Sequence, residues 1–358
     1  MQALPSIRVA DVPAGGLVQY AIDSRDRARA LRDECVAWLP RRSSSTLPLL
    51  DKATRNWLRR SQSPYVGEIE AIAKSLEHVG VWFLNGCYQW GCTALAREQD
   101  GAPWLARTLD WPFPGLGRRL EIWRMQGAAG RFDNATWPGY VGTLTGSAPG
   151  RFAASINQAP LRRRTRRPIL RPLDMMLNAL RTWRIRHMPP DHLLRLVFET
   201  AKTFGEAKHL LETTPVARPV IYTLVGCERG ERCVIERTED SFQTRNEETS
   251  AANNWLRDVW PWEARVRAVN LITRTYEEAA ENSRKRRQAL AGWSGQFARG
   301  SFEWVTPPVL NQQTRLAVEL CPANGRLRAV GFEAVQGKEL PEPATQICDL
   351  APALAQPA

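Results

Sequence analysis

The dipeptide Asp100-Gly101 constrains the fold most, because it lies between two short and largely apolar runs. An Asp-Gly pair favours a two-residue hairpin turn, since both turn residues have to adopt a positive φ. In the register that such a turn sets, Cys92 lies opposite Leu109, and Arg107 is its diagonal neighbour on the same face. The hairpin therefore predicts a thiol that lies beside a fixed cation.

A carboxylate follows this hairpin in the sequence. The second strand is predicted from Trp104 to Thr108, which leaves Asp110 beyond its end. A bulge or a turn is needed to point Asp110 into the same pocket, and the Trp-Pro pair after it is suited to one. The sequence thus predicts a cluster of Cys92, Arg107 and Asp110.

Three interpretations of Cys92 follow from the residues alone. A Cys–His pair would have to be assembled from distant segments, because none of the four histidines lies near Cys92 in sequence. An N-terminal cysteine can instead use its own α-amine as the base, whose pKa of about 7.7–8.0 suits that task. This second route requires cleavage between Gly91 and Cys92. In the third interpretation, Cys92 is a small buried residue, which is the common fate of a free cysteine.

The residues around Cys92 resemble a known family. Cys92-Thr93-Ala94, the Asp-Gly turn and the run from Arg107 to Trp111 are similar to the nucleophile region of the acid ceramidase and N-acylethanolamine-hydrolysing acid amidase family. Its members are N-terminal-nucleophile hydrolases, in which cleavage before the cysteine activates a proenzyme. The resemblance covers about residues 82 to 332, through these further segments: Gly142 to Phe152 with Asn157, Thr203 to Lys208, Tyr222 to Arg237, and Pro308 to Asn311.

The resemblance implies roles for the cluster in amide hydrolysis. Cys92 would supply the nucleophile and, through its freed α-amine, the base. Arg107 would stabilise the thiolate, since a nearby cation lowers the pKa of a thiol. Asp110 would hold the α-amine in place. Without the resemblance, Arg107 and Asp110 are better interpreted as a plain surface ion pair.

The oxyanion donor is where the chain departs from the family. The family has an asparagine where this chain has Cys227, which is a poor hydrogen-bond donor. The oxyanion would then be bound by a backbone N–H, by Asn157 or by the Asn253-Asn254 pair, or else activity is reduced or lost. Arg237 matches a family arginine and is a further candidate, with an exposed arginine at a strand end as its alternative.

The implied fold is an α+β, four-layer αββα sandwich of the N-terminal-nucleophile type. Residues 1–91 are expected to form a helical segment, with its clearest helices at Arg25 to Trp38 and Glu68 to Val79. After cleavage this segment would stay bound as a small subunit, because its apolar helix faces need a partner. Residues 92–340 would form the hydrolase domain, and residues 341–358 a flexible tail.

Cysteine content and the ends of the chain bear on its environment. Seven cysteines fit a reducing interior better than a disulfide scaffold. The pairs Cys87/Cys92 and Cys227/Cys233 are loosely spaced for zinc, and we expect neither a metal nor a cofactor. No signal peptide or membrane span is visible, so a cytoplasmic protein is expected.

The formal net charge of +12 raises the question of an acidic partner. The densest basic runs are Leu161 to Arg171 and Ser283 to Arg287, while Arg41 to Thr46 forms a polar loop. Neither run is interleaved with aromatic residues, so nucleic acid is not expected. We expect a solvated basic face that can make peripheral contact with anionic lipid, worth about 1 kcal/mol per basic residue.

The sequence therefore predicts an amidohydrolase that cleaves a non-peptide amide of an apolar acyl chain, such as an N-acylethanolamine or a ceramide-like lipid. A related acylase for bile-salt, penicillin or acyl-homoserine-lactone amides, or an acyltransferase, is the enzymatic alternative. A degenerate homologue that binds lipid amides without turnover is the non-enzymatic one, because of Cys227.

Overall fold

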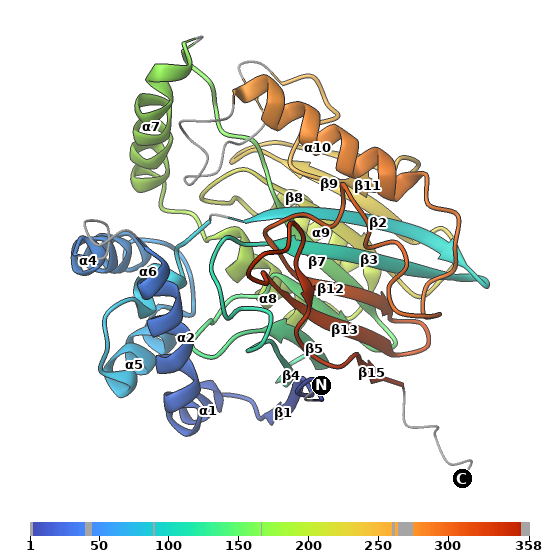
Figure 1. Cartoon of the computed structure of the whole chain (residues 1–358), viewed down its shortest axis with the longest axis horizontal. Helices are drawn as coiled ribbons and strands as arrows, with labels where there is room; N and C mark the ends of the chain where they lie inside the picture. The colour runs from blue at the N-terminus through green and yellow to red at the C-terminus, as the bar shows by residue number, and fades with distance from the viewer. Residues whose placement is uncertain are drawn as a thin grey trace.

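Two stacked β-sheets form the body of the protein (Figure 1). The structure is a computed structural model, which describes residues 3–39, 45–88, 90–165, 167–259, 262–263 and 275–351. The eight-stranded sheet has the order β1 (Arg8–Val12), β4 (Glu121–Gly127), β5 (Gly130–Thr136), β6 (Thr145–Ala148), β7 (Phe152–Gln158), β8 (Val220–Val225), β9 (Arg232–Arg237) and β10 (Phe242–Arg245). The seven-stranded sheet has the order β11 (Ser250–Ala251), β2 (Gly91–Gln99), β3 (Ala102–Asp110), β12 (Thr314–Cys321), β13 (Arg326–Glu333) and β14 (Glu342–Pro343), with β15 (Cys348–Leu350) also on β13.

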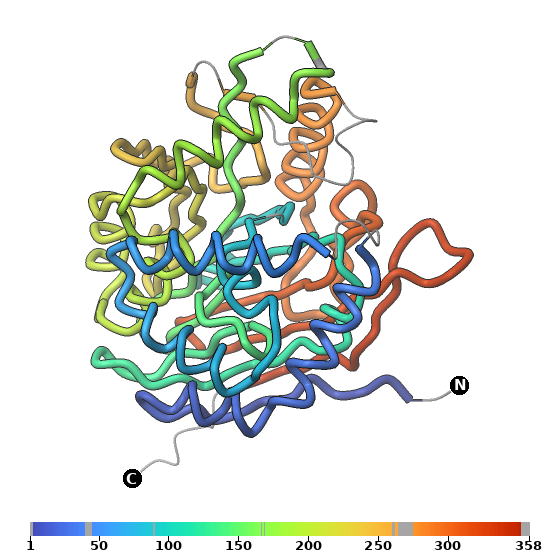
Figure 2. The backbone as a smooth tube through the Cα atoms, turned by 90° about the vertical axis from the view of Figure 1, so that its left-hand side faces the viewer, coloured from blue at the N-terminus to red at the C-terminus, as the bar shows by residue number. Residues whose placement is uncertain are grey.

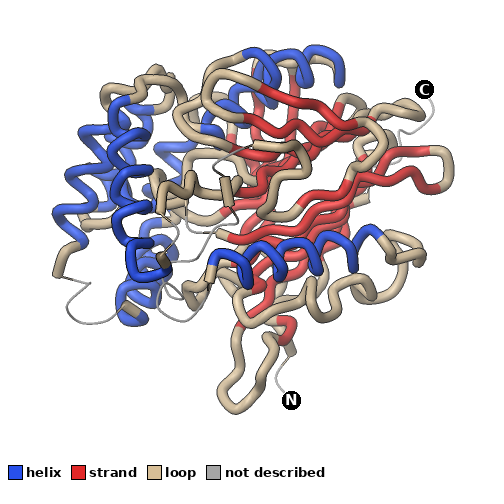
Figure 3. The backbone as a smooth tube through the Cα atoms, turned by 90° about the horizontal axis from the view of Figure 1, so that it is seen from above, coloured by secondary structure: helices blue, strands red, loops and turns tan. Residues whose placement is uncertain are grey.

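Helices cover the outer face of each sheet. Helices α8 (Pro190–Thr200) and α9 (Phe204–Thr213) pack on the eight-stranded sheet, and α10 (Tyr276–Ala291) packs on β2 and β11 of the other. Strands β2 and β3 contact β7 and β8 across the space between the sheets. Figure 3 shows the strands enclosed between these helices. The expected α+β sandwich with layers αββα is therefore confirmed.

The hairpin of β2 and β3 has the predicted turn and register. Asp100 and Gly101 both have positive φ, at 52° and 79°, and Cys92 pairs with Leu109. The second strand was predicted too short, because β3 continues to Asp110. The bulge lies in the neighbouring strand β12, whose register shifts between Thr314 and Leu316, and not in β3. Pairing with β12 on its other edge keeps the end of β3 in the sheet.

The N-terminal segment lies at one end of the sandwich. Figure 2, which faces this end, shows its helices in blue in front of the strands, with α7 in green above them. The helices are α1 (Leu17–Asp23), α2 (Arg25–Trp38), α4 (Leu47–Leu58), α5 (Val66–Leu76), α6 (Val81–Leu84) and, from later in the chain, α7 (Arg171–Arg184), which follows the short 3-10 helix η1 (Pro168–Leu170). The predicted helix at residues 25–38 is confirmed, and the one predicted at 68–79 begins two residues earlier and ends three residues earlier. Strand β1 was not predicted: it pairs in parallel with β4, so the segment also contributes an edge strand.

The predicted flexible tail is wrong for residues 342–350. Strands β14 and β15 both pair with β13, and Cys348 and Leu350 pack against the main core. Their backbone hydrogen bonds order a stretch whose composition alone suggests flexibility. Residues 352–358 of that tail, and residues 41–44 of the predicted polar loop, lie outside the described residues. No helix within the described ranges is long and apolar enough to cross a membrane.

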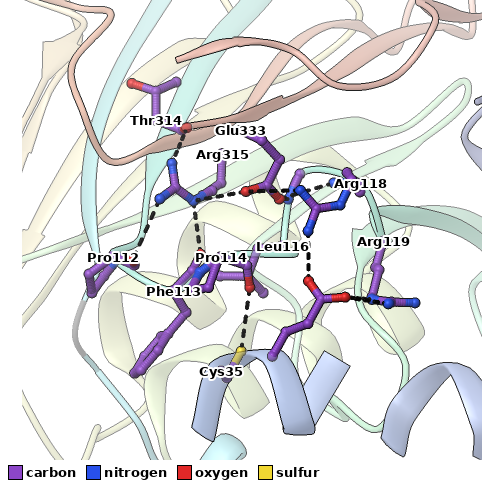
Figure 4. A network of polar contacts seen from close by, with 12 residues as sticks. Cys35, Pro112, Phe113, Pro114, Leu116, Arg118, Arg119, Thr314, Arg315 and Glu333 are labelled. Carbon is purple, nitrogen blue, oxygen red and sulfur yellow. Dashed lines mark hydrogen bonds and ion pairs between the residues drawn. The ribbon is translucent and has the colours of Figure 1, made fainter. Parts of the chain in front are cut away.

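A polar network ties helix α2 to the loop between β3 and β4 and to the seven-stranded sheet (Figure 4). On the helix, Glu34 forms ion pairs with Arg118, at 2.7 Å, and with Arg119. Glu333 at the end of β13 accepts from the backbone N–H of Arg118 at 3.2 Å and lies 4.0 Å from Arg315. The buried Arg315 donates to the carbonyl of Phe113 at 2.8 Å and so holds the loop after β3.

We expect the substitution Arg315→Met to lower the free energy of unfolding by about 3 kcal/mol, because it leaves Glu333 and several carbonyls without their buried cation. Urea denaturation followed by tryptophan fluorescence measures this loss. The matched control is Arg326→Met, which removes an arginine that pairs with Asp349 at the surface. A surface pair contributes at most about 1 kcal/mol. Equal effects of the two substitutions would contradict a structural role for the network.

Candidate functional site

The thiol of Cys92 lies between the two sheets. Cys92 is the second residue of β2 and is fully buried. Arg107, on the same face of the hairpin, donates from Nη2 to the Cys92 Sγ at 3.1 Å and to the Ile156 carbonyl at 3.0 Å. Its Nη1 bonds to Thr145. The predicted thiol and cation are therefore in direct contact, and the cation is fixed by β6 and β7 of the opposite sheet.

The pKa of Cys92 is raised, contrary to the effect expected from Arg107 alone. Burial raises the pKa most, and the nearby Arg107 guanidinium lowers it by less. Desolvation disfavours the charged form of any thiol that water does not reach. In the uncleaved chain, Cys92 is therefore held as a neutral thiol.

The backbone of Cys92 is held as firmly as its side chain. Its N–H donates to Asn253 Oδ1 at 2.9 Å. Arg286 of α10 donates from Nη1 to the Cys92 carbonyl at 2.7 Å and from Nη2 to Asn253 Oδ1 at 2.9 Å. One guanidinium thus joins Cys92 to the asparagine that contacts its backbone nitrogen.

Arg286 was not among the predicted site residues, and its run was expected to be solvated. Helix α10 begins with a capping box formed by Thr275 and Glu278. From there its buried positions follow the helical period, and they are Tyr276, Ala279, Ala280, Ser283, Arg286 and Leu290. The prediction was wrong because it assigned every residue of the run from Ser283 to Arg287 to the solvent-exposed surface. The 3.6-residue period starting at the capping box would have placed Arg286 inside.

Asp110 lies on the other face of the hairpin from the thiol. Alternate residues of a strand point to opposite faces, so Asp110 shares its face with Thr93 and not with Arg107. It accepts from Thr314 Oγ1 at 2.9 Å and lies 3.7 Å from Arg286. The predicted cluster is therefore split by the strand: the thiol and Arg107 lie on one side, and Asp110 on the other. Asp110 pairs with Gly91, next to the proposed cleavage point.

The two predicted asparagines meet at one short segment. Asn157 donates to the carbonyl of Ala252 at 3.2 Å, and Asn253 donates to the carbonyl of Gln158 at 2.8 Å. These reciprocal bonds fasten the end of β7 to the segment after β11. Asn253 contacts Cys92 directly, whereas Asn157 supports the segment that carries it.

Two residues that the family resemblance singled out lie elsewhere. The Arg237 guanidinium donates to the carbonyls of Leu211, Glu212 and Thr214, so it holds the end of α9 and is not part of the cluster at Cys92. Cys227 lies in the turn between β8 and β9, where its N–H bonds to Glu231 at 2.9 Å. It follows Tyr222, which pairs with Ile156 beside Arg107, by five residues. At about 3.3 Å per residue, Cys227 is too far along the sheet to act on Cys92.

In the described part of the run at residues 161–171, Arg164 and Arg167 are exposed as predicted, but other arginines are less solvated. Arg162 pairs with Glu239 at 2.8 Å, and Arg163 with Glu277 at 2.8 Å. Arg171 is buried. Side chains already paired with acidic residues contribute less to an attraction for anionic lipid, so the expected basic face is smaller than the net charge suggests.

The cysteines are all free thiols. Within the described part of the chain, no three His, Cys, Asp or Glu residues are grouped so that they could hold a metal ion.

Replacing Arg286 should destabilise the fold and loosen the contacts that hold the backbone of Cys92. In Arg286→Met, Asn253 Oδ1, the Cys92 carbonyl and Asp110 lose a buried cation, so we expect a loss of about 3 kcal/mol in the free energy of unfolding. The control is Arg284→Met on the exposed face of α10, which only pairs with Glu281. Urea titration of the Cys92→Ala forms of both variants, which are not expected to cleave, gives the comparison. A loss no greater than that of the control would contradict the assigned contacts.

Comparisons with known proteins agree with these motifs. No protein-family model matches the chain. It is 27% identical over 244 residues to the N-acylethanolamine-hydrolyzing acid amidase of Oryctolagus cuniculus, covering 66% of this chain and 61% of that protein. It is 35% identical over 106 residues to the acid ceramidase of Pan troglodytes, covering 30% and 25%. A solved N-acylethanolamine-hydrolyzing acid amidase ortholog from Caenorhabditis elegans aligns with 65% of this chain and 93% of its own at 17% identity, with a TM-score of 0.47.

The extent of these alignments limits which properties of the relatives can be assigned to this chain. The chain spans about three fifths of the length of the Oryctolagus cuniculus protein and a quarter of the acid ceramidase. The sequence similarity is nevertheless to the two enzymes whose motifs the residues around Cys92 resemble. The chain is thus a distant relative of the N-acylethanolamine-hydrolysing acid amidases and the acid ceramidases.

Proposed function

We propose that this protein is an amidohydrolase that cleaves the amide of an apolar acyl chain through Cys92, after self-cleavage between Gly91 and Cys92. The observation that carries the proposal is the arrangement around Cys92. Its sulfur contacts Arg107, and its nitrogen, which would become the α-amine, contacts Asn253. A single residue whose two ends are both held in this way suits an N-terminal nucleophile.

Self-cleavage would begin at the neutral thiol. The Cys92 Sγ attacks the Gly91 carbonyl carbon, the thiol proton passes to the Cys92 nitrogen, and the peptide bond is exchanged for a thioester. Water then adds to the thioester carbon and releases Gly91 as a carboxylate and Cys92 as a free α-amine and thiol. Asn253 would hold the nitrogen as its bond to Gly91 breaks, and Asp110, opposite Gly91, would pair with the new ammonium group.

Hydrolysis of a substrate would repeat these steps with the amine now free. The α-amine takes the thiol proton, the thiolate attacks the acyl carbon, and the proton passes to the leaving amine. Water then releases the acid from the thioester. Arg107 would stabilise the thiolate, and the Asn253 side-chain amide would donate to the oxyanion once substrate displaces the Gln158 carbonyl from it.

An apolar acyl group is favoured by the surroundings of the cluster. A cavity of about 80 Å³ lies under the N-terminal segment, and its lining is almost entirely apolar. Trp111 and Phe113, just after Asp110, form one wall, and Leu31 and Val36 of α2 lie among the residues of the other. Such a surface suits a hydrocarbon chain.

The N-terminal fragment would stay bound after cleavage. Tyr88, three residues before Gly91, donates to the buried Asp191 of α8 at 2.5 Å. Strand β1 is paired with β4, and Glu34 with Arg118. These contacts are spread along the whole fragment and support its role as a tightly bound small subunit.

An active site is favoured over a degenerate one. The reason for expecting degeneration was Cys227, in place of the family's asparagine. Its position in the β8–β9 turn means that it does not occupy the place of a donor near Cys92. Asn253 is the amide that contacts the nucleophile.

Self-cleavage is tested by the intact mass of the purified protein at several values of pH. We expect wild type to give two fragments, the larger beginning at Cys92, and Cys92→Ala to give none, since it lacks the sulfur. Cys87→Ala is the matched control, because Cys87 is also buried and lies five residues earlier, and it should be cleaved as wild type is. A single uncleaved wild-type chain at every pH would refute the proposed mechanism.

Turnover is tested on the cleaved fraction with acyl amides. We expect Asn253→Ala to lower kcat by about 100-fold with little change in KM, since an oxyanion donor acts mainly in the transition state. Asn254→Ala, which removes the neighbouring amide bonded to Ser283, should cost much less. Cys227→Asn should change neither constant. A rise in kcat for Cys227→Asn would instead favour the degenerate homologue.

A further inference from the structure

A second cavity, of about 260 Å³, lies where the N-terminal segment meets α7 and the body. Trp57 and Tyr88 line it from the N-terminal segment, and Met175 and Trp183 from α7. From the body, Gln158 and Arg218 line it. Its volume is near the lower end of those that hold small ligands. The cavity combines apolar walls with several polar side chains, which also include Asn178 and Thr182.

Arg218 lines this cavity and forms no ion pair with a carboxylate of the described residues. Its guanidinium lies 4.0 Å from the centre of the Tyr88 ring, and no carboxylate or carbonyl of the described residues bonds to it. Arg162, close by, pairs with Glu239 at 2.8 Å, and Arg195 pairs with Glu199 at 2.8 Å. Burial lowers the pKa of Arg218 by more than the nearby Tyr88, Cys87, Asp191 and Glu239 raise it. An arginine that lines a cavity and bonds to no carboxylate or carbonyl of the described residues is suited to binding an anion.

Gln158 brings a second unpaired group to the same cavity. Its Oε1 is buried and has no hydrogen-bond partner among the described residues. A buried polar atom without a partner is costly, so its presence in a cavity indicates a ligand that satisfies it. The cavity therefore offers the Arg218 cation and, in Gln158 Oε1, a hydrogen-bond acceptor without a partner among the described residues.

The cavity adjoins the nucleophile. The backbone carbonyl of Gln158 accepts from Asn253 Nδ2 at 2.8 Å, and Asn253 Oδ1 accepts from the Cys92 N–H at 2.9 Å. Tyr88 is four residues before Cys92 in the chain. A ligand bound between Arg218 and Gln158 would thus have its reactive end beside the segment that holds Cys92.

We propose that this cavity binds acyl amides whose head group carries a carboxylate, that is, N-acyl amino acids, with Arg218 pairing the carboxylate and Gln158 Oε1 accepting the amide N–H. The planar guanidinium can hold both carboxylate oxygens at once. The proposal rests on the proposed function and narrows its substrate class from neutral lipid amides to anionic ones. Hydrolysis adds one water across the amide bond and gives a fatty acid and a free amino acid.

The test uses two amides that differ only in charge at the head group. N-Octanoylglycine ends in a carboxylate, N-octanoylethanolamine ends in a hydroxyl, and both have the same acyl chain. We expect wild type to prefer the glycine amide in kcat/KM, and Arg218→Met to lose about 10- to 100-fold for it, as for the loss of a hydrogen-bonded charge. The ethanolamide should be almost unaffected. Arg218→Lys should recover part of the loss, because it restores the charge without the fork.

Arg60→Met is the matched control. Arg60 is exposed, lies over the Trp183 ring at 4.4 Å, and does not line the cavity, so it tests for a general effect of positive charge. We expect it to leave both substrates unchanged. Calorimetric titration with N-octanoylglycine measures binding separately from turnover, for wild type and for each variant.

The outcomes separate this inference from the proposed function. If wild type hydrolyses both amides equally and Arg218→Met changes neither, the carboxylate site is refuted and the amidohydrolase stands. If neither amide is hydrolysed, but Arg218→Met alone abolishes the binding of N-octanoylglycine, the site stands and the proposed function fails. An equal loss for both substrates, with release of the N-terminal fragment, would mean that Arg218 binds the new Gly91 carboxylate instead, and would refute the inference.

Discussion

The contact of Arg107 with Cys92 is the interaction on which the rest of the structure depends. Arg107 is fully buried between the sheets, where a cation without partners would be very costly. Its two terminal nitrogens bond to the Cys92 sulfur from its own sheet and to Thr145 and the Ile156 carbonyl from the other. The same guanidinium thus fixes both the spacing of the two sheets and the position of the thiol. The packing of the core and the geometry of the site therefore depend on the same contacts.

The alternation of side chains along β2 and β3 divides the site into two halves. The thiol and Arg107 face the other sheet, whereas Asp110 and Thr93 face α10. The backbone of Cys92 runs between them and is held by Arg286 from the helix side. This division keeps the negative carboxylate away from the sulfur while leaving it next to the Gly91–Cys92 peptide bond. The sulfur and the backbone nitrogen of Cys92 therefore have separate neighbours.

The N-terminal segment is part of the site as well as a neighbour of it. It contributes walls to both cavities. Its last described anchors before the proposed cleavage point are Tyr88, bonded to Asp191, and the buried Trp90, whose ring packs against that of Trp111. If the peptide bond after Gly91 is broken, these contacts, together with β1 and the contacts of Glu34, would hold the segment in place and keep the cavities.

The sequence alone determined the features that depend on near neighbours in the chain. The Asp-Gly turn fixed the hairpin register, and with it the contact between Cys92 and Arg107, because a two-residue turn allows one pairing. Only the tertiary structure decided which distant groups meet that hairpin. Arg286 lies nearly two hundred residues away from Cys92, and the face of Asp110 depends on pairing with β12. A one-dimensional pattern does not encode such contacts, since they arise from how helix and sheets pack.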